Sequence, residues 1–422
     1  MKKRIYRRMP VNQFQPSSIS LDEVGARLVF AVDVAKVDMV AAIAGDDGRV
    51  LNTIAWKAPS ENAAVLGILQ AFRAAGFLVE VAMEPSATYG DVLQYHLEKD
   101  GFPIFMVSGK RTYDARELYD GVPSLHDAKS AAIIARLHLE GLSKPACAPC
   151  PERRQLHAAI TIMELHQRRY LQLVGNLESW LARHWPELPA LVDLTAASLM
   201  ALLARIGGPA DVAAQRSEAE KLLHGISRGL MDKEKITAIL DSAGPSVGVP
   251  LMGMERNALM EIAAEAHRAL RAFKGAKTEL EKLAAPTPAA AMAPVIGRTT
   301  AAIVYTDVGD ANLYSSAGSF VKAMGMNLKE KSSGTIKGQI KITKRGSSRV
   351  RHYLWLAVFR WIQKDPIANA WYERKVKRDG GKSSRAAVAL MRKLAKALYY
   401  VGRGAPFESS KLFDVRRLEL AA

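Results

Sequence analysis

The chain has 422 residues, of which 49% are hydrophobic, and it carries a formal net charge of +17. This length allows two or three domains with hydrophobic cores, and the surplus of positive charge favours a nucleic acid over a small acidic substrate. No run approaches the ~18 apolar residues of a membrane span, and no apolar segment of a signal peptide follows the basic N-terminus. Composition therefore predicts a soluble cytoplasmic protein without a membrane partner.

The first third of the chain predicts an α/β domain over residues 27–142, preceded by a basic arm at residues 1–26. Its expected elements are strands at 28–34, 39–44 and 50–56, a helix at 61–75, a strand at 78–83, a helix at 88–99, a strand at 103–107 and a helix at 127–140. The short connections between the first strands predict an antiparallel meander. A meander followed by alternating helices and strands is typical of RNase H-like (RuvC-like) domains, and Rossmann-like units lack it.

Three acidic residues of this domain are candidate metal ligands. Asp33 interrupts an apolar strand, Glu84 ends the fourth strand, and Asp127 begins the last helix. In that strand order the first and fourth strands are neighbours and the helix end passes over them, so we expect the three carboxylates to meet. Oxygen ligands of this kind suit Mg²⁺. For Asp33 alone, a hydrogen-bonded structural role is the alternative, because an unpaired buried charge is costly.

The middle third, residues 143–285, is predicted to be all-α after a proline-rich linker. Apolar residues recur at helical spacing over 153–184 and again in shorter segments up to 284. Two long helices are expected to pair within one chain or as a coiled coil between chains, and a plain spacer bundle is the alternative to a dimerisation role. Cys147 and Cys150 lie in the linker, where their thiols are interpreted as incidental and as compatible with a reducing cytosol.

The last third, residues 286–415, is predicted to be mainly α-helical and to contain a strongly basic segment at 329–351. That segment is predicted to be a glycine-rich loop that leads into a helix near Ser347 or Ser348. Clustered cations of this kind release counterions from phosphates and bind nucleic acid. The candidate nucleic-acid contacts are Lys329, Lys331, Lys337, Lys341, Lys344, Arg345, Arg349 and Arg351.

Two hydroxyl groups, those of Ser332 and Ser333, precede Gly334 within this basic segment. A serine among cations is a candidate nucleophile, because the cations stabilise its alkoxide and the charge of a phosphoryl transition state. The alternative is a solvated loop that contacts phosphate and does no chemistry.

Motifs at the two ends of the chain support each other. They are Val-Asp33-Val-Ala-Lys36, Met-Glu84-Pro-Ser-Ala-Thr-Tyr-Gly90 and His-Asp127-Ala-Lys-Ser at one end, and Pro-Val-Ile-Gly297, Ser-Phe320-Val-Lys-Ala-Met-Gly325, Ser-Ser333-Gly334 and Ile-Thr-Lys-Arg-Gly346 at the other. This combination resembles the DEDD-type transposases of the IS one-ten insertion-sequence family, and Piv-type DNA invertases share the layout. The resemblance covers nearly the whole chain.

The resemblance implies a site-specific recombinase of the bacterial cytoplasm, associated with the nucleoid. Its RuvC-like carboxylates are expected to hold Mg²⁺, and Ser333, or Ser332 beside it, to form a phosphoserine link to DNA. The implied partners are donor DNA, target DNA and a guide (bridge) RNA encoded in the element. Homodimers are expected to assemble into a tetramer.

One position departs from the family pattern. The family usually has a second aspartate three residues after Asp127, where this chain has Ser130. Either Ser130 and water complete the metal site, or Asp114 or Asp120 reaches into it. The alternatives to a transposase are a RuvC-like nuclease that uses water and a non-catalytic nucleic-acid-binding remnant.

Overall fold

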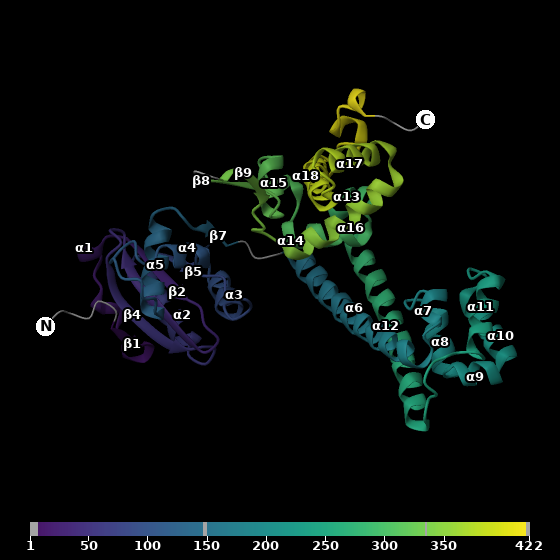
Figure 1. The fold of residues 1–422 in the computed structure, drawn as a ribbon. Coiled ribbons are helices and arrows are strands. Elements are labelled where there is room, and N and C mark those ends of the chain that lie inside the picture. Colours follow the sequence, from purple (N-terminus) through teal and green to yellow (C-terminus); the bar gives the residue numbers. More distant parts are fainter. Residues whose placement is uncertain (1–6, 147–149, 334–335, 419–422) are drawn as a thin grey trace. The chain divides into compact units, whose positions relative to one another are not determined.

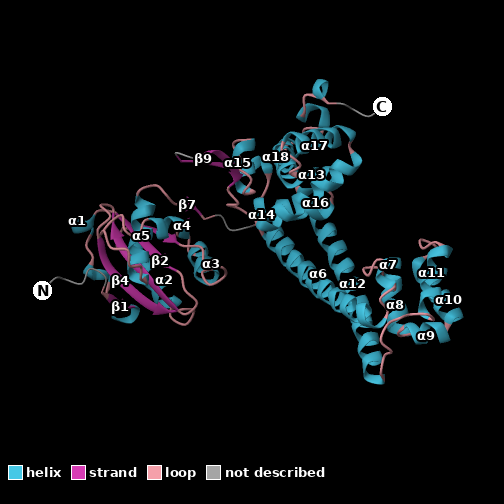
Figure 2. Cartoon of the chain, viewed as in Figure 1, coloured by secondary structure: helices cyan, strands magenta, loops and turns pink. Residues whose placement is uncertain are grey.

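The computed structural model describes residues 7–146, 150–333 and 336–418, without the side chains of residues 331–333, 336, 337 and 339. The chain divides into two compact units, residues 1–148 and 149–422 (Figure 1). The first unit is a sheet with helices on it, and the second is almost entirely helical (Figure 2). The predicted mixture of an α/β part and an all-α part is therefore confirmed. Among the described residues, no helix is both long and apolar enough to cross a membrane.

The first unit is built on a seven-stranded sheet with the strand order β1-β4-β3-β2-β5-β6-β7. Its strands are β1 (Arg8–Pro10), β2 (Arg27–Asp33), β3 (Asp38–Gly45), β4 (Val50–Lys57), β5 (Leu78–Met83), β6 (Ile104–Met106) and β7 (Lys144–Pro145). β2, β3 and β4 form the predicted antiparallel meander. β5 lies parallel to β2, because helix α2 (Asn62–Ala74) carries the chain back along the sheet.

Helices cover both faces of this sheet. Apolar side chains of α2 and α3 (Asp91–Lys99) join one core with the side chains on one face of the strands. The other face packs against α5 (Asp127–Leu139), which is alanine-rich and therefore lies close to the strands. The short helices α1 (Leu21–Val24) and α4 (Gly109–Asp114) complete the unit. Strand side chains alternate between faces, so α5 shares a face with every second residue of β2 and β5.

The prediction of a basic arm over residues 1–26 is wrong for the described part of that segment. β1 pairs in parallel with β4 at the sheet edge, and Val11, Phe14 and Ile19 are buried in the core of the unit. The positive charges of this segment suggested a tail, but its spaced apolar residues anchor it. At the opposite edge of the sheet, β7 pairs with β6. β7 lies in the segment that was predicted to be a linker. Cys150 is a free thiol, and Cys147 lies outside the described residues.

Two long helices, α6 (Pro151–His184) and α12 (Gly253–Ala284), lie side by side in the second unit (Figure 1). The start of α6 shares a core with the end of α12, and Leu177 of α6 shares another with Leu259 of α12. The two helices are therefore antiparallel within one chain, as one of the two alternatives predicted. Near Leu177 pack α7 (Leu188–Leu191), α8 (Ala197–Arg205), α9 (Pro209–Ala214), α10 (Arg216–Ser227) and α11 (Lys233–Ala243).

The C-terminal helices pack around α14 (Arg298–Val308), which is buried over most of its length. They are α13 (Ala289–Ile296), α15 (Ala317–Ala323), α16 (Ser348–Lys364), α17 (Pro366–Arg378) and α18 (Ser383–Val401). α13 is followed directly by Gly297, which has a φ of 84°. A glycine adopts that left-handed conformation without strain and so ends the helix there.

The predicted glycine-rich loop at 329–351 is instead a β-hairpin for much of its length. Strands β8 (Leu328–Ser333) and β9 (Ile336–Ile342) are antiparallel, and Gly334 lies outside the described residues. The alternation of isoleucine with polar residues in β9 is a strand pattern that the density of charge obscured. α16 begins at Ser348, as predicted, and the side chain of Ser347 accepts a hydrogen bond from Val350 N at 3.1 Å.

Candidate functional site

The strand register places the first two predicted carboxylates next to each other. Val32 of β2 pairs with Met83 of the parallel strand β5, so Asp33 and Glu84 follow at the same level at the carboxyl ends of both strands. Glu84 N donates to Val32 O at 3.4 Å across this strand end. By alternation, both side chains belong to the face that α5 covers, which brings them toward the end of the helix that carries Asp127.

Asp33 lies at the electrostatic centre of this group. Burial, together with the charges of Glu84 and Asp127, raises the pKa of its carboxyl group to about 6, while the hydroxyl group of Ser130 and the cation of Arg8 act in the opposite direction. A carboxylate that is desolvated and faces two others is short of positive charge. Asp33 is thus better suited to bind a cation than to serve as a satisfied structural residue.

Glu84 is held in place by the start of α4. Burial raises the pKa of its carboxyl group, and Thr112 acts against this rise. The Glu84 carboxylate rests on the Cα of Gly109, where a Cβ atom would lie 2.2 Å from Glu84 Oε1. A larger residue at this position would push the Glu84 carboxylate aside, so Gly109 helps to set the place of Glu84.

Asp127 meets a cation that the sequence did not predict. Its Oδ2 lies 2.9 Å from Nη1 of Arg8, which the edge strand β1 carries to the site, and both side chains are about half exposed. This pair was not predictable from the sequence, because Arg8 lies in a segment whose charges suggested a free arm. The available signal was the series of apolar residues that follows it, Met9, Val11, Phe14 and Ile19.

The structure places Ser130 one helical turn after Asp127, where its hydroxyl group faces Asp33 and lowers the pKa of that carboxyl group. The two acids considered as substitutes have other contacts. Asp120 Oδ1 accepts from Nζ of the buried Lys129 at 2.8 Å, and Asp114 Oδ2 lies 2.7 Å from Nζ of the exposed Lys110. Ser130 occupies the position of the family's second aspartate, and of these three residues it is the one whose side chain acts on Asp33.

The donor set fits a hard divalent cation by its chemistry, because it consists of carboxylate and hydroxyl oxygens around a desolvated aspartate. In the part of the chain that the structure describes, no three histidine, cysteine or acidic side chains are close enough together to hold a metal ion. The predicted convergence thus holds for Asp33 with each of its two neighbours, rather than for all three at one point.

The second group of predicted residues lies on the β8–β9 hairpin. Lys329 and Lys341 are paired directly across the strands, and both are exposed. Like charges opposite each other destabilise a hairpin unless an anion lies between or above them. Ser333 pairs with Ile336 at the hairpin end, but the side chains of Lys331, Ser332, Ser333 and Lys337 lie outside the described part.

Two of the eight residues predicted to contact nucleic acid, Arg349 and Arg351, instead form contacts within the chain. Arg349 Nη2 lies 2.5 Å from Asp307 Oδ1 of α14, Nη1 of the same arginine lies 3.6 Å from Glu164 Oε2 of α6, and the pair with Asp307 is largely buried. Arg351 donates to the carbonyl oxygens of Gly346 at 2.9 Å and of Ser347 at 3.1 Å. Lys344 and Arg345 are exposed at the hairpin base.

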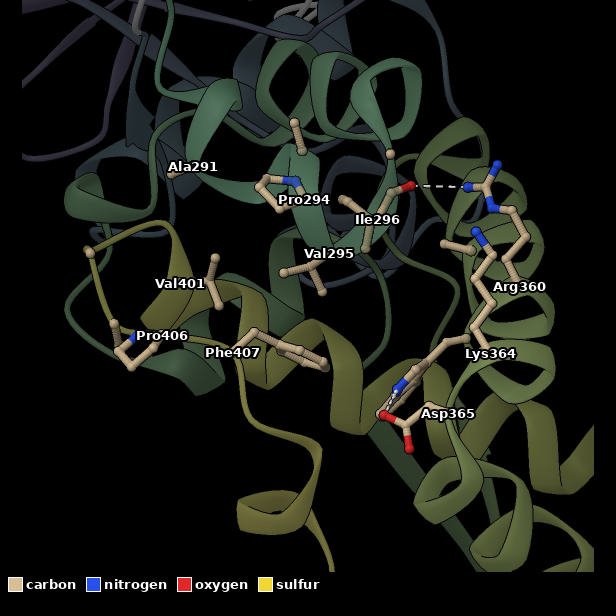
Figure 3. Close-up of a pocket in the computed structure, with 16 residues that line it drawn as sticks. Ala291, Pro294, Val295, Ile296, Arg360, Lys364, Asp365, Val401, Pro406 and Phe407 are labelled. Carbon is tan, nitrogen blue, oxygen red and sulfur yellow. Dashed lines mark hydrogen bonds between the residues drawn. The ribbon is translucent and has the colours of Figure 1, made fainter.

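A cavity of about 910 Å³ lies between α13, α16 and the segment after α18 (Figure 3). Arg360 reaches toward α13 and donates to Ile296 O at 2.9 Å, and the Nε1 atom of Trp361 donates to Asp365 Oδ2 at 3.1 Å. None of the predicted site residues lines this cavity. Arg360 and Trp361 of α16 thus serve to join helices.

The chain was compared with known proteins. Residues 30–183 match a family model described as a transposase, of the DEDD type of IS110 elements, and residues 290–373 match the model of the Transposase IS116/IS110/IS902 family. The matched segments together span more than half of the chain. The first contains Asp33, Glu84 and Asp127, and the second contains Ser332 and Ser333.

A curated relative named "Insertion element IS110 uncharacterized 43.6 kDa protein", from Streptomyces coelicolor, is 25% identical over 197 residues. The similar region covers 46% of this chain and 45% of the relative, so it spans about half the length of each protein.

Proposed function

The chain belongs to the IS110 family of transposases, and we propose that it cuts and rejoins DNA through a covalent phosphoserine intermediate. The observation that carries the proposal is that the two matched segments contain different chemical groups. One contains a desolvated carboxylate group, and the other contains paired serines in a cationic hairpin. A RuvC-like nuclease that uses water needs only the first of these.

The cationic hairpin supports contact with a phosphodiester backbone. The opposed pair Lys329 and Lys341, together with the exposed Lys344 and Arg345, concentrates positive charge on the hairpin that carries Ser333 at its end. Nucleic-acid phosphates relieve the repulsion of such cations and release counterions on binding. The charge that destabilises the free hairpin thus becomes a source of affinity for DNA.

Ser333 is the proposed nucleophile. Its Oγ forms a bond to the scissile phosphorus, the bond from phosphorus to the deoxyribose oxygen breaks, and the serine proton passes to the leaving hydroxyl group. One phosphodiester is exchanged for another, so a strand is rejoined by the reverse attack of a different DNA hydroxyl group, without an energy source. The neighbouring cations stabilise the charge that develops on the phosphoryl oxygens.

The proposed metal ligands are Asp33, Glu84 and Asp127, with Ser130 beside them. A divalent cation bound there, Mg²⁺ by the oxygen donors available, would neutralise charge on the scissile phosphate and its leaving oxygen. Gly109 keeps Glu84 in position, and α5 carries Asp127 and Ser130 on successive turns. Arg8 pairs with Asp127 and would have to release it before Asp127 could help to hold a divalent cation.

The two groups lie in separate units of the chain, so we propose that they cooperate between protomers in a homodimer, and that dimers pair into a tetramer that holds donor and target DNA. The recognition of those DNA sequences is proposed to depend on a guide RNA, as the family resemblance implies. A location at the nucleoid follows from the same proposal.

The test of the nucleophile is the covalent adduct. Wild-type protein, Ser333→Ala and Ser332→Ala are incubated with labelled DNA, guide RNA and Mg²⁺, and the products are separated on a denaturing gel. Ser333→Ala is expected to abolish the adduct while RNA binding persists. An adduct that survives in Ser333→Ala but not in Ser332→Ala moves the role to Ser332, and cleavage by both variants supports a water-using nuclease instead.

The test of the carboxylates is metal binding itself. Isothermal titration with Mn²⁺ is expected to give a clear heat for the wild-type protein and at least a tenfold weaker affinity for Asp33→Asn or Glu84→Gln, since each removes a ligand charge. Asp38→Asn, which changes an exposed aspartate at the start of β3, serves as the control. Equal affinities in all proteins would contradict the assignment.

A further inference from the structure

A second cationic site lies between α17, α18 and the C-terminal segment 409–418, apart from the hairpin. It is a cavity of about 310 Å³, near the lower end of the range for small-ligand sites. Five of the side chains that line it are cations: Arg374, Lys375, Arg378, Lys393 and Arg417. Most of these residues come after residue 373, where the second family match ends.

The cations of this pocket outnumber the acids that pair with them. Lys375 contacts Asp379 of the same helix, and Arg417 Nε lies 2.9 Å from Asp414 Oδ2. Arg378 Nε is 3.8 Å from Asp379, which Lys375 already neutralises, and the Arg378 side chain is 70% exposed. Among the described residues, five positive charges therefore meet two negative ones around this cavity, so the pocket favours an anion.

Aromatic residues form the wall behind these cations. The rings of Trp371 and Phe413 have centroids 5.5 Å apart, and Lys393 Nζ lies 5.6 Å from the first and 5.0 Å from the second. Lys393 Nζ also donates to Leu412 O at 2.6 Å, which fixes the C-terminal segment against α18. Phe413 is buried, whereas Trp371 is only partly buried and lines the cavity.

We propose that this pocket binds an unpaired nucleotide of a single-stranded nucleic acid, with the phosphate at Arg378 and Arg417 and the base against Trp371. A cationic rim next to an accessible aromatic ring is the arrangement that binds single strands, since every base has a face that stacks and every nucleotide carries a phosphate. A duplex keeps its bases stacked on each other, so it offers the pocket phosphates only.

The experiment measures the binding of full-length protein to a fluorescein-labelled oligothymidylate and to a labelled DNA duplex by anisotropy. It is done in EDTA, so the result does not depend on the proposed serine and metal chemistry. Trp371→Leu is expected to weaken binding of the single strand about tenfold, as loss of one stacked base does, and to change duplex affinity less than about twofold. Trp371→Phe keeps an aromatic ring and is expected to bind nearly as the wild type does.

The charge of the pocket is tested separately with Arg378→Gln/Arg417→Gln. This double variant is expected to reduce the slope of log affinity against log salt for the single strand by about 0.7, since the two arginines share one phosphate and each neutralised phosphate contributes about 0.7. Lys221→Gln/Lys233→Gln removes the same charge from exposed positions on α10 and α11 and is the matched control.

Several outcomes would overturn the proposal. They are equal losses for duplex and single strand in Trp371→Leu, a loss in Trp371→Phe as large as that in Trp371→Leu, and a double arginine variant that binds no more weakly than the lysine control. If the variants of the pocket bind nucleic acid normally but lose self-association, the pocket binds another protein chain, and the nucleotide assignment is wrong.

Discussion

At the scale of single residues, the chemistry of the first unit centres on the shortage of positive charge around Asp33. Its neighbours Glu84 and Asp127 both disfavour the ionised form, and the cation that reaches the group, Arg8, pairs with Asp127. A site that binds a divalent cation is expected to be unstable without it, because the carboxylates then repel each other.

This repulsion predicts a pH dependence. The pKa of Asp33 rises from 3.8 to about 6 on folding, so the folded chain binds the proton more tightly, and stability falls as pH rises through this interval. Without metal, Asp33→Asn is expected to stabilise β2 and β5 by about 2 kcal/mol above pH 6, after allowance for partial solvent access, and to have little effect below pH 4.

Hydrogen exchange of peptides from both strands measures this change in stability. Asp38→Asn should leave their exchange unchanged, and equal protection in wild type and Asp33→Asn at neutral pH would contradict the prediction.

Arg349 offers a second prediction at this scale. Its ion pair with Asp307 is largely buried, so Arg349→Met leaves a buried carboxylate without its partner and is expected to lower the free energy of unfolding by about 3 kcal/mol. Lys341→Gln changes an exposed side chain and is expected to leave stability within about 0.5 kcal/mol while weakening DNA binding. Urea denaturation and filter binding measure the two effects. A stable Arg349→Met protein with weakened DNA binding would assign Arg349 to phosphate contact after all.

At the scale of elements, the hairpin depends on how its base is attached to the helices. Thr343 N donates to Asn327 O at 2.8 Å, and the backbone of Gly346 passes so close to α15 that a Cβ atom would lie 2.4 Å from Ala323 O. Gly346 also has a φ of 145°, which other residues rarely adopt. The hairpin is therefore held at its base, while its cationic strands extend from the helical core.

This attachment predicts different effects for two glycines. Gly346→Ala is expected to cost at least about 2 kcal/mol and to displace the hairpin, because both the contact and the backbone angle oppose a side chain. Gly338→Ala, in β9, has no atom within 4 Å of the added Cβ and should cost only about 1 kcal/mol for its φ of 65°. Thermal unfolding ranks the two variants, and equal costs would mean that the close approach at Gly346 is not a constraint.

At the scale of the whole molecule, the proposed catalytic groups belong to two compact units. The carboxylates lie in residues 1–148 and the serines in residues 149–422. A composite site of this kind allows one protomer to supply the carboxylates and its partner to supply the serine.

Such sharing predicts complementation. Asp33→Asn and Ser333→Ala proteins are each expected to be inactive, and a mixture allowed to exchange subunits is expected to recover part of the adduct formation, since some mixed dimers contain one intact site. Mixing either variant with itself is the control. Failure of the mixture, in conditions where subunit exchange is shown by labelled protein, would place both groups of one site in the same chain.

Much of this protein was predictable from the sequence because local patterns dominate there. The strands of the meander, the helix that begins at Asp127 and the start of α16 at Ser348 follow from hydrophobic periodicity and from capping by neighbouring side chains. Asp33 and Glu84 were found because an acid in or next to an apolar strand is unusual. The motifs at both ends of the chain already indicate the family.

Only the tertiary structure decided which charges have partners inside the chain. It paired Arg8 with Asp127 and Arg349 with Asp307 across 119 and 42 positions of the sequence. It turned a segment predicted to be a loop into a hairpin and a predicted arm into an edge strand, because the backbone of each segment pairs with a neighbouring strand and the apolar residues of the N-terminal segment are buried in the core. Composition counts every charge alike. The role of a charge depends on its distance to an opposite charge and on how much water remains between the two. Both quantities are defined only in the folded chain.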